Sequence, residues 1–175
     1  MSRQPTGRAV RRGLRLPVVA RGGNLPDVST VDLRVRTPVK APPELVWRRV
    51  TDWERQGDWM LATKVRLTGG NGQSIGTSLT AFTGVGPIGF TDTMEISDWQ
   101  PPYRCQVRHT GRVVRGTGEF SVASRDGGAV VAWGEELELP FGRLGRWGWR
   151  LVRPLFAAGI RLSLRRLARL CESQT

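Results

Sequence analysis

Turn-forming clusters divide the middle of the chain, from about residue 61 to residue 139, into short runs. The runs between the clusters are rich in threonine, valine, isoleucine and aromatic residues, which is typical of β-strands. Short connections make neighbouring strands antiparallel. The clusters are GGNG at 69 to 72, GVGPIG at 84 to 89, DWQPP at 98 to 102, TGRVV at 110 to 114 and SRDGG at 124 to 128.

The carboxy-terminal segment, from Arg143 to Glu172, has the period of one long helix. Steps of 100° per residue place one set of apolar residues and glycines on a single side, which we expect to face the sheet: Trp147, Gly148, Leu151, Val152, Leu155, Phe156 and Gly159. Arginines occupy the other side: Arg143, Arg146, Arg150, Arg153 and Arg161. Beyond Ile160 the apolar side drifts round to Leu164, Leu167 and Cys171.

Before these elements, residues 29–39 alternate between apolar and polar side chains, which predicts a half-buried strand. A short helix follows, because Pro42 and Pro43 fit a first helical turn, and Gly57 ends or bends it. The segment 41–60 also contains three tryptophans. Two of them, Trp47 and Trp53, are predicted to belong to the core, whereas Trp59 fits either the core or a ligand contact.

Length and charge set broad limits. We expect one domain over residues 28–175, preceded by a disordered basic arm, residues 1–27, which contains six arginines and no acidic residue before Asp27. This arm either tethers the protein to nucleic acid or lipid headgroups or has no binding role. No apolar run is long enough to span a membrane, no secretory signal is evident, and a cytoplasmic location is expected. Cys105 and Cys171 form no CxxC pair, so neither a metal nor a cofactor is expected.

The order of the predicted elements resembles the helix-grip fold of the START-like, polyketide cyclase/dehydrase-like (SRPBCC) superfamily. Three stretches of the sequence carry the resemblance: TPVKAPPELVWRRVTDWERQGDWM, MEISDWQPPYR and AVVAWGEELELP. The resemblance implies an α+β fold in which a curved antiparallel sheet of about seven strands wraps around the long carboxy-terminal helix. A short helix pair would follow the first strand. Relatives include aromatase/cyclases, dehydratases and passive carriers, so the fold alone does not decide the activity.

Two of the side chains that can transfer protons are expected on the hairpin around DWQPP. Pairing its strands so that apolar residues share a face places Ile96 opposite Cys105, Met94 opposite Val107 and Asp92 opposite His109. His109 is the only histidine in the chain. On an apolar inner face, Asp92 and His109 would form a general acid/base pair. The alternatives are that the two residues pair in solvent at the end of the sheet, or that a slip of one residue turns both outward.

A third candidate is Glu135, which shares a face with Trp133 on the last predicted strand. If Trp133 points inward, Glu135 does too. It would then be an acid or a ligand-binding carboxylate in an apolar cavity. The alternative is an ion pair with an arginine of the terminal helix.

The leading functional hypothesis is a non-catalytic protein that binds a small hydrophobic molecule, of lipid, isoprenoid or polyketide type, in an internal cavity. The residues expected to line this cavity are Val31, Leu33, Val35, Trp59, Leu79, Met94, Ile96, Val107, Phe120, Trp133, Leu137, Leu151 and Leu155. The first alternative is a cyclase or dehydratase that uses Asp92, His109 or Glu135 in the same cavity. The second is binding of nucleic acid or an anionic membrane surface by the arginines, since these account for almost all of the formal charge of +12.

Overall fold

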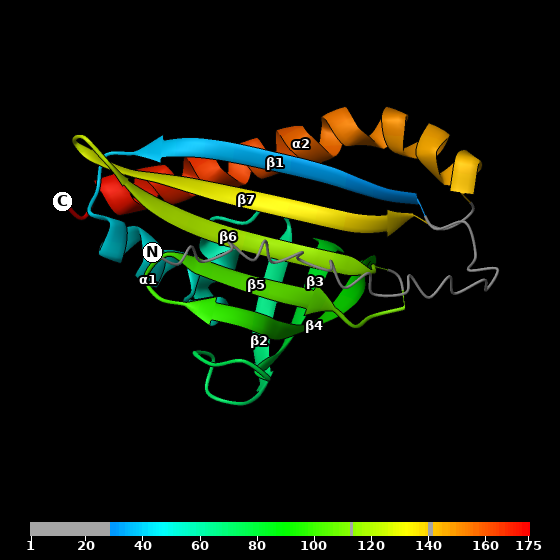
Figure 1. The fold of residues 1–175 in the computed structure, drawn as a ribbon, viewed down its shortest axis with the longest axis horizontal. Helices are drawn as coiled ribbons and strands as arrows, with labels where there is room; N and C mark the ends of the chain where they lie inside the picture. The colour runs from blue at the N-terminus through cyan, green and yellow to red at the C-terminus, as the bar shows by residue number, and fades with distance from the viewer. Residues whose placement is uncertain (1–28, 113, 140–141) are drawn as a thin grey trace, which may run out of the picture.

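The computed structural model describes residues 29–112, 114–139 and 142–175, so the predicted basic arm lies outside the described residues. Seven strands, two α-helices and one 3₁₀-helix follow each other along this part of the chain (Figure 1). Their bounds are β1 Ser29–Val39, α1 Pro43–Val50, η1 Trp53–Asp58, β2 Thr63–Gly69, β3 Ser78–Val85, β4 Ile88–Gln100, β5 Arg104–His109, β6 Gly116–Arg125, β7 Gly128–Leu139 and α2 Gly142–Glu172.

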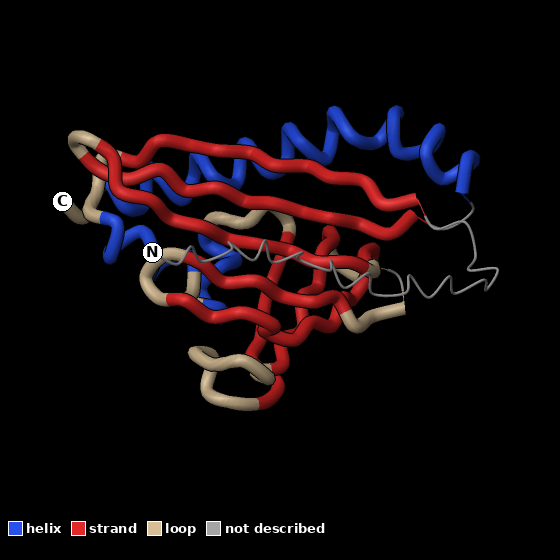
Figure 2. Tube along the Cα trace, viewed as in Figure 1, coloured by secondary structure: helices blue, strands red, loops and turns tan. Residues whose placement is uncertain are grey.

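All seven strands belong to one antiparallel sheet with the order β1-β7-β6-β5-β4-β3-β2. Every sequential pair from β2 to β7 forms a hairpin, and β1 closes against β7. The strands β1 and β7 run along the long axis of the molecule, whereas β2 runs steeply across them, so the sheet is strongly twisted (Figure 2). The prediction of an α+β fold with a curved seven-stranded sheet, a short helix pair and a long terminal helix is confirmed.

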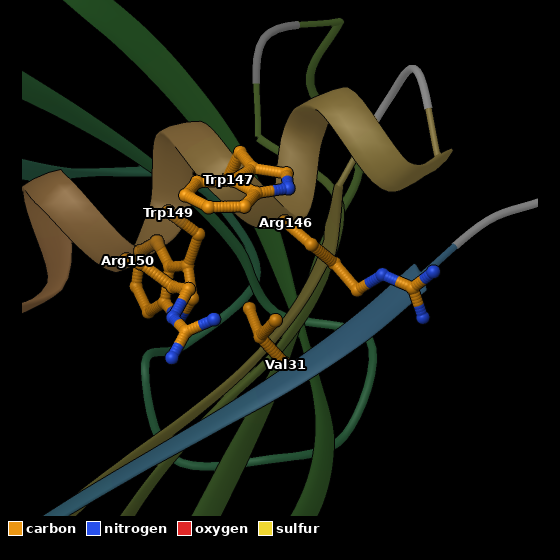
Figure 3. Close-up of a pocket in the computed structure, with 5 residues that line it drawn as sticks. All are labelled: Val31, Arg146, Trp147, Trp149 and Arg150. Carbon is orange, nitrogen blue, oxygen red and sulfur yellow. The ribbon is translucent and has the colours of Figure 1, made fainter.

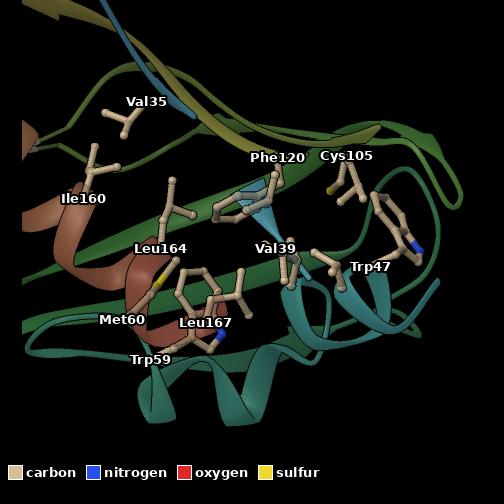
Figure 4. Packing of buried hydrophobic residues seen from close by; sticks show 14 of the residues in the cluster. Val35, Val39, Trp47, Trp59, Met60, Cys105, Phe120, Ile160, Leu164 and Leu167 are labelled. Carbon is tan, nitrogen blue, oxygen red and sulfur yellow. The ribbon is translucent and has the colours of Figure 1, made fainter. Parts of the chain in front are cut away.

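The hydrophobic core lies between the inner face of the sheet, meaning the face that the helices cover, and the helices α1, η1 and α2. The C-terminal half of α2 points Ile160, Leu164 and Leu167 into this core, where they meet residues from the sheet and from the segment around Trp59 and Met60 (Figure 4). A hydrogen bond also fixes α2 to the connection between η1 and β2, because the Leu61 amide donates to Ser163 Oγ at 2.9 Å.

The three tryptophans in and directly after the helices α1 and η1 are buried. Trp47 and Trp53 surround Trp99 of β4, with ring centroids 5.2 Å and 6.5 Å from it. Trp59 packs edge-on against Phe120 and Trp133 of the sheet, at 5.9 Å and 6.1 Å. Each indole therefore buries a large apolar area, which holds the two short helices against the sheet.

The indole nitrogens of Trp53 and Trp59 differ in their hydrogen bonds, and this difference predicts different losses of stability on substitution. Trp53 Nε1 donates to the carbonyl of Gly72 at 2.7 Å, whereas Trp59 Nε1 is buried and meets no acceptor in the described part of the chain. Trp53→Phe is therefore expected to lower the free energy of unfolding by about 1 kcal/mol more than Trp59→Phe, because only Trp53→Phe leaves a buried carbonyl without a donor. Urea denaturation of both variants measures the difference, and equal losses would contradict it.

The long helix α2 is rotated differently from the prediction. Leu151 and Leu155 are 80% and 76% exposed, so their predicted place on the inner side of the helix is wrong. The rotation of α2 is set by its C-terminal half, where Ile160, Leu164 and Leu167 are buried. Leu151 lies nine residues before Ile160, which is about two and a half turns, and therefore falls on the opposite side. No helix in the described part of the chain combines the length and the apolar character needed to cross a membrane.

The β4–β5 hairpin also departs from the predicted register. The strand β4 continues to Gln100, which pairs with Arg104, and a bulge shifts the register between Ile96 and Asp98. Ile96 consequently lies opposite Val107 and Met94 opposite His109, two residues away from the predicted pairs. Because a shift of two residues keeps every side chain on its own face, Asp92 and His109 still share the inner face.

Candidate functional site

The imidazole of His109 lies between two carboxylates on the inner face of the sheet. Its Nδ1 atom is 2.6 Å from Asp92 Oδ2, and its Nε2 atom is 3.2 Å from Glu135 Oε2. The other oxygen of Glu135 accepts a hydrogen bond of 2.6 Å from Trp133 Nε1. The three titratable side chains are nearly closed to solvent, with exposed fractions of 8% for Asp92, 7% for His109 and 9% for Glu135.

Three strands bring these residues together. Asp92 comes from the start of β4, His109 from the end of β5 and Glu135 from the second half of β7. The start of β6 lies between β5 and β7, and its residue Gly118 pairs with Glu135 of β7. A Cβ atom on Gly118 would lie 3.3 Å from Glu135 Oε1, so the absence of a side chain there leaves room for the carboxylate. His109 and Glu135 can therefore meet across the intervening strand.

This arrangement decides between the alternatives that the sequence left open. Asp92 and His109 neither pair in solvent nor face outward, and among the described residues Glu135 pairs with His109 and Trp133 rather than with an arginine of α2. The two carboxylates bind different ring nitrogens and do not converge on one point. The group is thus a hydrogen-bonded chain in which Asp92 contacts one ring nitrogen of His109 and Glu135 faces the other.

The environment shifts the proton affinity of His109 upward. Burial by itself lowers the pKa of the imidazole, but the hydrogen bonds and negative charges of Asp92 and Glu135 outweigh this effect and raise the pKa to about 9. His109 is consequently an imidazolium at neutral pH. Burial also raises the pKa of the Cys105 thiol to about 12, so this thiol is not a thiolate nucleophile at neutral pH.

A glycine next to Asp92 gives a prediction for this group. A Cβ atom on Gly111 would lie 3.0 Å from Asp92 Oδ1, an atom that is buried and lacks a hydrogen-bond partner among the described residues. Gly111→Ala is therefore expected to push the carboxylate from His109 and to lower the pKa of His109 by about one unit or more. NMR titration measures this pKa without ambiguity, because the chain has one histidine. Gly148→Ala is the control, since its added Cβ would meet no atom within 4 Å outside its own turns of α2. An unchanged pKa in Gly111→Ala would contradict the prediction.

A hollow of about 400 Å³ lies near this group, between β1 and the N-terminal half of α2. Trp149 and Arg150 extend from α2 toward Val31 of β1, whereas Arg146 extends toward the N-terminal end of β1, and the ring of Trp147 lies alongside the helix (Figure 3). Val31 pairs with Leu137 of β7. Glu135 lies on the same face of β7, two residues before Leu137, which is about 7 Å along the strand. The hollow and the group of Asp92, His109 and Glu135 thus share one end of the inner face.

The residues predicted to line a cavity fall into three sets. Seven are buried in the hydrophobic core: Leu33, Val35, Trp59, Leu79, Ile96, Val107 and Phe120. Four are half-buried: Val31, Met94, Trp133 and Leu137. Leu151 and Leu155 are exposed on the outer side of α2. Among the predicted residues, Val31 lines the hollow directly, and ligand binding by the others remains a prediction.

Several parts of the site were not predicted from the sequence. Trp149, Arg146 and Arg150 line the hollow, but the helical pattern did not single them out as ligand contacts. The role of Gly111 beside Asp92 was also missed. The alternation along β7 could have revealed the contact between Trp133 and Glu135, because residues two apart on a strand share a face.

A comparison with protein-family models matches residues 30–172 to a family described as polyketide cyclase / dehydrase and lipid transport. None of the curated proteins matches the chain in sequence. The family match covers nearly all of the described residues, and it agrees with the resemblance that the sequence motifs carry.

Solved structures show the same fold at low sequence identity. The protein TTHA0849 from Thermus thermophilus is 17% identical, with a TM-score of 0.70 over 83% of this chain and 99% of that chain. The Zhui aromatase/cyclase from a Streptomyces species is 17% identical, with a TM-score of 0.67 over 82% of this chain and 94% of that chain. A major latex-like protein from Panax ginseng is 10% identical, with a TM-score of 0.63 over 81% of this chain and 97% of that chain. These likenesses establish the helix-grip fold.

Proposed function

Because the chain belongs to the polyketide cyclase/dehydrase and lipid transport family, we propose that it binds a small hydrophobic molecule of polyketide, isoprenoid or lipid type in the hollow between β1 and the N-terminal half of α2. One observation supports this most directly: the hollow beside Val31 lies on the same inner face as the buried group of Asp92, His109 and Glu135. The apolar part of the ligand would occupy the hollow, and its polar group would be oriented toward Glu135.

The lining of the hollow supports a ligand with a polar end. Val31, Trp147 and Trp149 offer apolar surface, and the two guanidinium groups of Arg146 and Arg150 lie at its margin. Burial of apolar surface supplies affinity at roughly 25 cal/mol per Å². Oxygen atoms of the ligand would find donors in the two arginines. The proposed ligand is therefore an amphiphile or an oxygenated hydrocarbon rather than a plain hydrocarbon.

Two measurements test ligand binding. Native mass spectrometry of the purified protein would detect a co-purifying small molecule. The fluorescent probe N-phenyl-1-naphthylamine, an apolar aromatic amine, would report whether the hollow accepts a small hydrophobic molecule. Val31→Trp fills the hollow and is expected to weaken binding of the probe by about tenfold or more. Ile75→Trp is the control because Ile75 is an exposed apolar residue that does not line the hollow. Equal binding by both variants would contradict the proposal.

Proton transfer is the second candidate function, and the geometry of His109 favours it. A dehydration needs a base that removes a proton next to a carbonyl and an acid that protonates the departing hydroxyl. His109 Nε2 lies 3.2 Å from Glu135 and can pass a proton to it or take one from it, while the 2.6 Å contact between Nδ1 and Asp92 holds the ring. In this candidate Glu135 acts on the ligand, and His109 supplies or receives the proton.

A poly-β-carbonyl thioester, followed by the absorbance of the aromatic product, tests this activity. His109→Gln is expected to slow turnover by about 10² to 10⁴-fold. The triple variant Asp92→Asn, His109→Gln, Glu135→Gln controls for folding, because it replaces all three groups by neutral amides of similar size. Unchanged turnover in His109→Gln would exclude the acid/base role and leave the binding proposal intact.

A further inference from the structure

The outer side of α2 carries a row of large apolar side chains that face solvent. Trp147, Leu151, Leu155 and Leu162 are 68%, 80%, 76% and 40% exposed. We call these four residues the outer stripe. The spacings between them are four, four and seven residues, so all four lie on one side of the helix. This side is opposite the buried Ile160 and Leu164. In Figure 1 this N-terminal half of α2 rises clear of the edge strand β1.

Such a row differs from the single apolar residues that are common on protein surfaces. Burying a leucine side chain fully stabilises a protein by roughly 1.5 to 3 kcal/mol relative to leaving it exposed. The exposed residues of the outer stripe do not make this contribution to the stability of the fold. A contiguous exposed apolar surface of this kind marks a binding surface. Its neighbours indicate which partner it fits.

The charge on α2 has a single sign over thirty residues. Between Gly142 and Cys171 the sequence contains no acidic residue, and Glu172 is the first. The arginines with described side chains are all exposed: Arg146, Arg150, Arg153, Arg161, Arg165, Arg166 and Arg169. None of them forms an ion pair with a carboxylate of the described residues. Arg161, Arg165 and Arg166 continue from the end of the outer stripe, and Arg150 stacks on Trp147 at 5.8 Å.

We propose that the outer stripe forms, together with Arg161, Arg165, Arg166 and Arg169, a docking surface for anionic phospholipid membranes. The helix would lie in the plane of the interface, with the tryptophan and leucines among the upper acyl chains and the guanidinium groups on the lipid phosphates. The apolar side chains and the arginines match the two chemical layers of such a membrane, the acyl chains and the phosphates. Acyl chains accept the apolar side chains, and phosphates balance the arginines.

Other occupants fit less well. A second copy of the chain would place this arginine-rich helix against the same helix, where like charges repel. Nucleic acid would satisfy the arginines but would leave the aliphatic Leu151 and Leu155 in the contact without bases that stack on them. The membrane proposal does not depend on the ligand proposal. If both hold, the hollow beside Val31 would open next to the bilayer, because Trp147 belongs to both surfaces.

Co-sedimentation of the full chain with vesicles tests the proposal. The wild type is expected to bind vesicles of phosphatidylcholine with phosphatidylglycerol more tightly than vesicles of phosphatidylcholine alone, with a steep dependence on salt. The double variant Leu151→Gln, Leu155→Gln is expected to weaken binding about tenfold or more. The triple variant Arg161→Gln, Arg165→Gln, Arg166→Gln is expected to lose the preference for anionic vesicles. Val85→Gln, Ile88→Gln is the matched control, since these residues are 78% and 81% exposed at the end of β3 and the start of β4.

Lipids with brominated acyl chains add a readout that depends on geometry. They are expected to quench the fluorescence of the bound wild type. Trp147→Phe, compared at a vesicle concentration that saturates the binding of both proteins, is expected to lose most of this quenching. Unchanged vesicle binding by the double leucine variant would overturn the proposal. So would binding to double-stranded DNA without binding to vesicles, or a concentration-dependent dimer that the leucine variant loses.

Discussion

His109→Gln is expected to lower the free energy of unfolding by about 3 to 5 kcal/mol at neutral pH. The wild-type imidazolium lies 2.6 Å from Asp92 and 3.2 Å from Glu135, and all three side chains are nearly closed to solvent. Glutamine fills a similar volume but carries no charge. Its introduction leaves two buried carboxylates with no cation between them. Chemical denaturation in urea measures the loss.

A matched background separates charge from packing. In a protein that already carries Asp92→Asn and Glu135→Gln, the substitution His109→Gln removes no charge pair. It is expected to cost about 1 kcal/mol or less there, since neutral amides can exchange hydrogen bonds. The same large loss in both backgrounds would show that the shape of the imidazole, rather than its charge, stabilises this part of the sheet.

The free energy of unfolding of the wild type is expected to fall by about 3 kcal/mol as the pH rises from 6.5 to 9. The pKa of His109 is about 9 in the folded protein, whereas the ordinary value is 6.5. A raised pKa means that the folded state holds the proton more tightly than the unfolded state. This stabilisation is fully present below pH 6.5 and is lost as the pH rises through about 9.

Urea denaturation at a series of pH values tests this dependence. The His109→Gln variant is the control, because it has no group at this position that titrates in the window. Its stability is expected to stay nearly constant between these two pH values. An equal slope in the wild type and the variant would assign the dependence to other groups and would contradict the raised pKa of His109.

The order of secondary structure was largely available from the sequence. The glycine- and proline-rich clusters separate the strands β3 to β7, and the alternation of Val31, Leu33 and Val35 predicts β1. Each signal is local, since a turn or a period of two depends on neighbouring residues alone. The bulge between Ile96 and Asp98 is a property of two paired strands, and the sequence of neither strand reveals it.

The candidate site shows the same division. Asp92, His109 and Glu135 could be selected from the sequence because each lies among apolar residues that share its face. The contact between His109 and Glu135 could not, because it crosses β6 and depends on Gly118. The surroundings of α2 were also misjudged. Its apolar residues fit two different sides of the helix, and the periodic pattern indicated the wrong side for Leu151 and Leu155.

The sequence by itself determined the elements, their order and the face on which each strand places its side chains, because these follow from local backbone geometry and from the burial of apolar side chains. The tertiary structure alone decided which strand positions lie opposite each other, which carboxylates enclose His109 and which side of α2 is buried. These depend on contacts between segments far apart in the chain, and the core around Ile160, Leu164 and Leu167 fixes the rotation of the helix. As a result the outer stripe of α2 faces solvent.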